Sequence, residues 1–294
     1  MGADPTPRRT RTMASSGETR NMALFCDFEN VALGVRDAKY EKFDIGKVLE
    51  RLLVKGSIVV KKAYCDWERY KQFKATMHEA AFELIEIPHV RQSGKNSADI
   101  RMVVDALDLC YTKSHVDTFV IISGDSDFSP LVSKLRENNK AVIGVGVKQS
   151  ASDLLISSCD EFIYYDDLVR EEKTQAKRSR KRPPPKAPSP VKAAAEPEEK
   201  AEHEDKTAHA LDLVMSTLDA LVAERGEDEK IWGSMIKQTL KRRHPGFNES
   251  YYGFKSFNDL LEEAAIRGLL DLKRDEKSGG YIVRAIAHEA GLEA

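Results

Sequence analysis

The stretch MALFCDFEN, residues 22–30, is an apolar run that ends abruptly at the carboxylate of Asp27. Residues 118–128, TFVIISGDSDF, repeat the pattern and end in Asp125 and Asp127. Short apolar runs of this kind, bounded by polar turn residues, predict buried β-strands. A carboxylate at the end of a buried strand costs free energy unless it has a partner, so these strand ends are where we expect a site.

Strand-like and helix-like segments alternate from residue 22 to residue 167. The expected strands are residues 22–28, 57–65, 82–88, 117–123, 140–147 and 161–165. The segments between them carry apolar residues three and four positions apart, as amphipathic helices do. This alternation indicates an α/β fold, in which a parallel sheet has helices on both faces.

The composition changes after residue 168. Proline, alanine and blocks of charge dominate the next segment, which cannot bury enough apolar surface to fold and is expected to be a linker. Beyond it, three helices and a hairpin of two short strands form a winged-helix pattern, so a small α+β domain is expected. The expected divisions are a disordered tail at 1–20, the α/β domain at 21–169, the linker at 170–206 and the C-terminal domain at 207–286.

Composition excludes several classes of protein. The formal net charge of −2 over 294 residues shows no overall preference for nucleic acid or membranes. The four cysteines are widely spaced, without a C-x-x-C pair, and are expected to be reduced core thiols. No run of about 18 apolar residues is present. We therefore expect a soluble, cytoplasmic protein with no membrane partner.

Parallel strands bring their carboxyl ends to one edge of the sheet, and sites assemble at that edge. Asp27 and Asp125 end the first and fourth expected strands, Asp99 lies in the first turn of the helix after the third, and Asp127 begins the next helix. Clustered carboxylates repel one another unless a cation neutralises them. Oxygen ligands without His or Cys favour Mg²⁺ or Mn²⁺.

Most of these acidic residues also have a purely structural interpretation. Asp99 is placed where a helix dipole favours an acid, and Asp127 is placed to cap the following helix. Glu29 is consistent with a simple turn and Asp66 with a cap of the helix that follows it. Asp105 lies six residues beyond Asp99, about 240° around the helix, and is expected behind the site.

Three blocks of the chain resemble the signature blocks of NYN domains, the LabA-like branch of the PIN nuclease superfamily. The blocks are DFEN at 27–30, KNSADIRMVVDAL at 95–107 and SGDSDFSPLV at 123–132. The resemblance implies a PIN-like three-layer α/β/α domain and a metal-dependent ribonuclease site. It assigns catalysis and metal binding to Asp27, Asp99, Asp125 and Asp127. Asn30 is then expected to line the substrate pocket, and Lys95 is a candidate phosphate contact.

The C-terminal segment resembles a LOTUS domain, also called OST-HTH. The resemblance lies in the spacing of WGSMIKQTLKRRHPGF, YYGFKSFNDLLEEA and the GGYIV hairpin. Lys237, Lys241 and Arg242 lie beside aromatic residues there, a combination suited to RNA. The expected partner is RNA, single-stranded, and a protein partner of the C-terminal domain is the alternative.

Two other functions compete with the ribonuclease. Asp125-Ser126-Asp127 imitates the D-x-D pair of haloacid-dehalogenase-type phosphatases, but it follows the fourth strand, not the first, and leaves Asp27 without a role. The other competitor is an RNA-binding adaptor with an inactive acidic cleft. Such an adaptor would rely on the basic linker and the C-terminal domain, because an acidic cleft without metal repels RNA.

Overall fold

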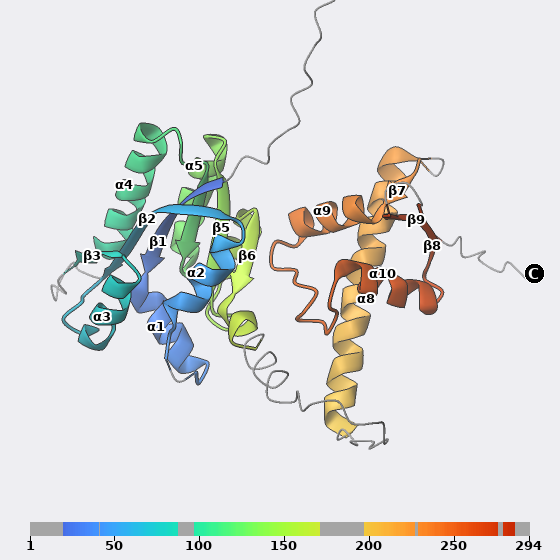
Figure 1. Cartoon of the computed structure of the whole chain (residues 1–294), viewed down its shortest axis with the longest axis horizontal. Coiled ribbons are helices and arrows are strands. Elements are labelled where there is room, and N and C mark those ends of the chain that lie inside the picture. The colour runs from blue at the N-terminus through green and yellow to red at the C-terminus, as the bar shows by residue number, and fades with distance from the viewer. Residues whose placement is uncertain are drawn as a thin grey trace, which may run out of the picture.

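The structure is a computed structural model of the chain (Figure 1). It describes residues 20–40, 42–87, 97–170, 197–226, 229–275 and 279–285. For residues 197–203 it describes the backbone alone. The predicted tail, except Arg20, lies outside these ranges, and so does the part of the predicted linker (170–206) that covers residues 171–196. No helix in the described ranges is long and apolar enough to cross a lipid bilayer.

The N-terminal half is built on a parallel sheet of six strands in the order β3-β2-β1-β4-β5-β6. The strands are β1 (Arg20–Asp27), β2 (Gly56–Cys65), β3 (Glu83–Glu86), β4 (Thr118–Ile122), β5 (Ala141–Gly146) and β6 (Glu161–Tyr164). The strand order reverses between β1 and β4, which pair directly. The first and fourth strands are therefore neighbours, and their ends bring Asp27 and Asp125 to the same place on the edge of the sheet.

Helices cover both faces of this sheet, which confirms the predicted three layers. One face packs on α1 (Phe28–Asp37), α2 (Ile45–Leu53) and α3 (Lys71–Glu79), and the other on α4 (Ser97–Thr112), α5 (Ser129–Glu137) and α6 (Asp153–Ser158). Strand β1 is central, and its residues alternate between the two cores: Leu24 and Cys26 face one core, and Ala23 and Phe25 face the other. The four cysteines are free and buried, as predicted.

Helix α1 was not expected from the sequence, which suggested a turn at Glu29 and Asn30. The helix begins because Asp27 occupies its N-cap and accepts a hydrogen bond from the backbone N–H of Asn30 at 3.4 Å. Phe28, the first helical residue, is fully buried against Trp67 and other aromatic rings. The residue that ends the strand therefore also starts the helix.

The C-terminal part combines three helices with a small antiparallel sheet in the order β7-β9-β8 (Figure 1). Its elements are α8 (Pro197–Arg225), β7 (Ile231–Trp232), α9 (Gly233–Arg243), α10 (Phe257–Ile266), β8 (Leu270–Arg274) and β9 (Tyr281–Ala285). Helix α8 starts at Pro197, whereas we expected order to begin at residue 207. The elements share one core, and their winged-helix assignment stays a prediction.

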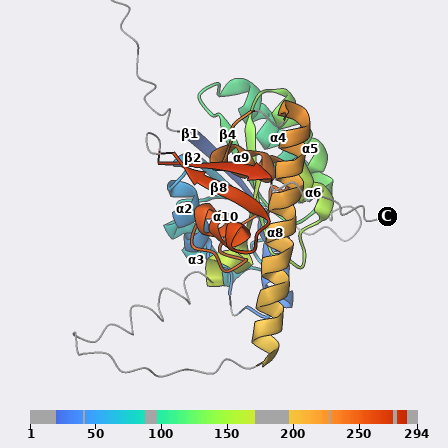
Figure 2. The same cartoon turned by 90° about the vertical axis from the view of Figure 1, so that its right-hand side faces the viewer.

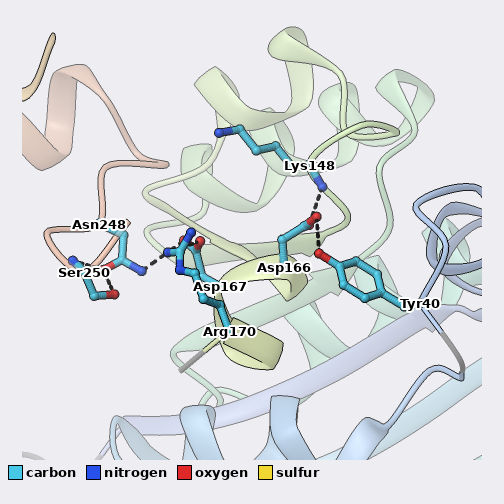
Figure 3. A network of polar contacts seen from close by, with 7 residues as sticks. All are labelled: Tyr40, Lys148, Asp166, Asp167, Arg170, Asn248 and Ser250. Carbon is cyan, nitrogen blue, oxygen red and sulfur yellow. Dashed lines mark hydrogen bonds and ion pairs between the residues drawn. The ribbon is translucent and has the colours of Figure 1, made fainter. Parts of the chain in front are cut away.

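The C-terminal part lies against the edge strand β6, and Figure 2 views it with the first domain behind it. The backbone N–H of Phe162 in β6 donates to the carbonyl of Pro245 at 3.0 Å. Asn248 Nδ2 donates to Asp167 Oδ2 at 3.0 Å (Figure 3). An open strand edge invites pairing with other chains, so this contact also protects the sheet.

Candidate active site

A cavity of about 220 Å³ opens at the carboxyl ends of β1 and β2. Five acidic residues line it: Asp27, Glu29, Asp66, Asp99 and Asp125. Asn30, Tyr64 and Cys65 also contribute to its wall. Three of the four predicted catalytic aspartates therefore meet in one cavity, at the edge where parallel strands bring their carboxyl ends together.

Asp27 is the most buried of these carboxylates, with 8% of its surface exposed. Its Oδ1 accepts from the backbone N–H of Asn30, and its Oδ2 accepts from Ser123 Oγ at 3.0 Å. Burial and the neighbouring charge of Asp99 nevertheless raise the pKa of Asp27 to about 7. Two hydrogen bonds therefore do not compensate for the cost of charging this group in the cavity.

Asp99 lies in the first turn of α4, as predicted. Burial raises its pKa, and the charges of Asp125 and Asp127 add to the effect. Asp125 follows β4, and its Oδ1 accepts from the backbone N–H of Asp127 at 3.0 Å, which starts the short 3-10 helix at Ser126–Phe128. Carboxylates whose pKa is raised by burial and by neighbouring charges cluster at functional sites.

The structure places the other predicted residues differently. Asp127 is exposed and is not among the lining residues, although its charge acts on Asp99. Asn30 lines the cavity, and its Oδ1 accepts from the backbone N–H of Gly124 at 2.8 Å. This bond directs the amide nitrogen of Asn30 to act as the donor toward a ligand. Lys95 lies outside the described residues.

Several lining residues were missed as site residues. Glu29 and Asp66 were interpreted as a turn residue and a helix cap. Glu29 directly follows the start of α1, however, and Asp66 directly follows the end of β2, at the same edge of the sheet. Their position at this edge is the signal by which the sequence could have identified them. Tyr64 lies in the buried end of β2, and its hydroxyl donates to Asp105 Oδ2 at 2.9 Å. Asp105 also accepts from Arg101 Nε at 2.9 Å and supports the wall from behind, as predicted.

The chemistry of the cavity fits a hard divalent cation, although the side chains are not arranged as a finished metal site. Its acidic donors are carboxylate oxygens, which Mg²⁺ and Mn²⁺ prefer. Burial, and after it the neighbouring carboxylates, raises the pKa of Asp27 and of Asp99, so a cation in the cavity would make both charged forms more favourable. Within the described ranges, however, no three His, Cys, Asp or Glu side chains are grouped closely enough to hold a metal ion.

The cationic residues predicted to bind substrate in the C-terminal domain lie on α9 and do not line the acidic cavity. Lys237 forms an ion pair with Glu249 at 2.9 Å, so its charge is partly neutralised. Lys241 and Arg242 lie in the last turn of α9, and Arg242 is exposed. Arg243 donates to the carbonyl of Ser216 on α8 at 2.9 Å.

Comparisons with known proteins match two domain families. The NYN domain matches residues 21–166, and the OST-HTH/LOTUS domain matches residues 209–282. An uncharacterised protein from Methanocaldococcus jannaschii is 26% identical over 165 residues, covering 56% of this chain and 63% of that protein, less than two thirds of its length. The crystal structure of a Vibrio parahaemolyticus protein of unknown function is 28% identical, with a TM-score of 0.47, and covers 53% of this chain and 98% of that one.

Proposed function

Because the chain carries an NYN domain, of the PIN-like nuclease superfamily, followed by an OST-HTH/LOTUS domain, we propose that it is a metal-dependent ribonuclease. The domain pair is that of an RNA-related nuclease or RNA-binding protein. The cavity shared by Asp27, Asp99 and Asp125 is the observation that supports metal-dependent cleavage of RNA. Two of these carboxylates have raised pKa values, which a bound cation would return toward their usual range.

In the proposed reaction, water hydrolyses a phosphodiester bond of single-stranded RNA at this cavity. Asp27, Asp99 and Asp125 would hold Mg²⁺ or Mn²⁺, and Asp127 would add negative charge from outside the cavity. When bound, such an ion lowers the pKa of a coordinated water and stabilises charge on the phosphate. Asn30 orients a phosphate oxygen through its amide nitrogen, because its Oδ1 is engaged by Gly124.

Asp27 has a second role in this proposal, because it is also the N-cap of α1. Its hydrogen bonds to Asn30 and Ser123 fix the carboxylate at the junction of β1 and α1. The Ser123 hydroxyl additionally accepts from the backbone N–H of Asp125 at 3.2 Å. These bonds join the two strand ends into one rigid support, so the carboxylates need little reorganisation during the reaction.

The C-terminal OST-HTH/LOTUS domain is proposed to bind RNA, with Lys241 and Arg242 as phosphate contacts. Both lie in the last turn of α9, where Arg242 faces solvent. A protein partner is the alternative for this domain. Loss of affinity for long RNA when α9 carries Lys241→Ala and Arg242→Ala supports the RNA assignment, and unchanged affinity at the same ionic strength favours the protein partner.

The phosphatase alternative is less consistent with the cavity. A D-x-D phosphatase uses both acids on the substrate, but Asp127 does not line the cavity and its backbone N–H is bonded to Asp125. The distinguishing test incubates the full chain with labelled single-stranded RNA, then with a small phosphomonoester, each with Mn²⁺. We expect shortened RNA, no release of phosphate from the monoester and no covalent intermediate. A trapped phosphoenzyme on Asp125 supports the phosphatase instead.

A further inference from the structure

A second and larger cavity, of about 420 Å³, lies where the two domains meet. We call it the junction cavity. Lys148 and Tyr164 line it from the NYN domain, and Arg243, Phe247, Tyr251 and Tyr252 line it from the C-terminal domain. Its volume falls within the range of about 300–1,000 Å³ that is usual for pockets holding small ligands. None of the three catalytic candidates of the acidic cavity contributes to its lining.

The junction cavity is held in shape by contacts between the domains. Besides the bonds of Phe162 and Asn248, Gly246 lies so close to Tyr164 that a Cβ there would come within 2.6 Å of the tyrosine oxygen. Within the NYN domain, the backbone N–H of Lys148 donates to Asp166 Oδ2 at 2.7 Å, which fixes that wall of the cavity (Figure 3). Both walls are therefore fixed before any ligand arrives, which lowers the entropic cost of binding.

The lining combines aromatic rings with cations. Tyr164 and Tyr251 supply partly exposed rings, and Phe247 and Tyr252 supply rings that are almost entirely buried. Lys148 Nζ lies 3.7 Å from the ring centre of Tyr251, so this charge is already placed beside an aromatic face. Lys148 is exposed, and with Arg243 it outweighs Asp153, the one carboxylate among the lining residues. Rings that stack on bases beside cations that bind phosphates are the usual composition of single-strand RNA sites.

The junction cavity opens near the same edge of the sheet as the acidic cavity. Lys148 follows the end of β5, and Tyr164 is the last residue of β6. Strand β6 is three positions from β1 in the sheet, which at ~4.8 Å per strand separates their ends by roughly 14 Å. An extended RNA strand of a few nucleotides spans such a distance.

We propose that the junction cavity binds one nucleotide of the single-stranded RNA substrate, a few nucleotides away from the bond that is cut. The base lies among the aromatic rings, and Lys148 and Arg243 bind its phosphate. The site needs both domains, because each supplies a ring and a cation. The inference rests on the proposed function, since it takes RNA to be the substrate.

The test measures binding of a fluorescein-labelled octauridylate to the full chain by anisotropy, in EDTA so that no turnover occurs. Lys148→Met keeps the aliphatic stem beside Tyr251 but removes the charge, so we expect affinity to fall about fivefold and the salt dependence to weaken by about one phosphate contact. Tyr251→Leu removes a stacking face and is expected to weaken binding about tenfold. Lys148→Arg is expected to restore most of the affinity.

Two controls make the test specific. Lys113→Ala removes an exposed lysine after α4, at the opposite edge of the sheet, and is expected to leave the affinity unchanged. An octamer of abasic sites carries the phosphates without bases, so Tyr251→Leu should not change its affinity. Small-angle scattering of each variant checks that the domains still contact one another. If Tyr251→Leu separates the domains, the comparison of Lys148→Met with Lys148→Arg decides whether the junction cavity binds the nucleotide.

Octauridylate binding by Lys148→Met and Tyr251→Leu within about twofold of the unaltered chain overturns the inference. Failure of the ribonuclease proposal gives a different set of results. If the unaltered chain does not cut RNA with Mn²⁺ but both variants lose affinity, the ribonuclease proposal fails and the nucleotide site stands. If the chain cuts RNA and the variants bind normally, the junction inference alone fails.

Discussion

Asp27→Asn is expected to reduce cleavage of single-stranded RNA by roughly 10³-fold or more, because the lost charge stabilisation amounts to several kcal/mol and each 1.4 kcal/mol is worth about a factor of ten. The substitution preserves the shape of the side chain, and an Asn oxygen still accepts from the backbone N–H of Asn30. The expected loss is therefore one of chemistry and not of folding. Initial rates on a labelled oligonucleotide with Mn²⁺ measure it.

The same variant is expected to be more stable than the unaltered chain in metal-free buffer at pH 8. The pKa of Asp27 is raised from 3.8 to about 7, so the folded state binds a proton more tightly than the unfolded state does. The stabilisation of the folded state by this proton is complete below about pH 4 and is lost as the pH rises to about 7. The loss is on the order of 4 kcal/mol, which corresponds to roughly 8–16 °C in Tm.

Asp44→Asn is the matched control for Asp27→Asn. Asp44 is the N-cap of α2 and accepts from the backbone N–H of Gly46 at 2.9 Å, so the control makes the same change at an equivalent helix start. Asp44 is exposed and lies outside the acidic cavity. Cleavage by this variant should match that of the unaltered chain. Equal cleavage by Asp27→Asn as well would remove Asp27 from the site.

Asp99→Asn is expected to lower the cleavage rate by roughly 10²–10³-fold, since it also removes one carboxylate from the proposed metal site. The pKa of Asp99 is raised by burial and by the charges of Asp125 and Asp127, so its removal relieves repulsion. The Tm in metal-free buffer is therefore expected to stay constant or rise. Thermal unfolding followed by circular dichroism, beside the cleavage assay, separates the two effects.

Asp108→Asn provides the control on the same helix, because Asp108 is an exposed residue of α4 outside the cavity. It should change neither the rate nor the Tm. If Asp99→Asn and Asp108→Asn have the same small effect on cleavage, Asp99 is only a helix N-terminal acid favoured by the dipole.

The sequence predicted the meeting of Asp27, Asp99 and Asp125 because it depends on regular features. Buried apolar runs define parallel strands, and parallel strands share a carboxyl edge. The pairing of β1 with β4 then brings Asp27 and Asp125 together. The position of these residues at strand and helix ends is sufficient to predict that they meet, because the path of the backbone places them at the cavity.

Helix α1 was missed because Glu29 and Asn30 were taken as a turn, although Phe28, Val31 and Val35 have the spacing of one buried helix face. Other features depend on contacts that no local pattern contains. The placement of Asp127 outside the cavity follows from the 3-10 turn that Asp125 caps. The contact of Gly246 with Tyr164 joins residues of different domains, which sequence spacing does not relate.

The most direct test of the central claim is the initial rate of single-stranded RNA cleavage by the purified full chain in matched reactions that differ only in containing Mn²⁺ or EDTA. If Asp27, Asp99 and Asp125 hold a catalytic cation, RNA is cut with Mn²⁺ and stays intact with EDTA. Equal cleavage in both reactions, or no cleavage in either while the RNA binds, would contradict the assignment of this cavity as a metal-dependent ribonuclease site.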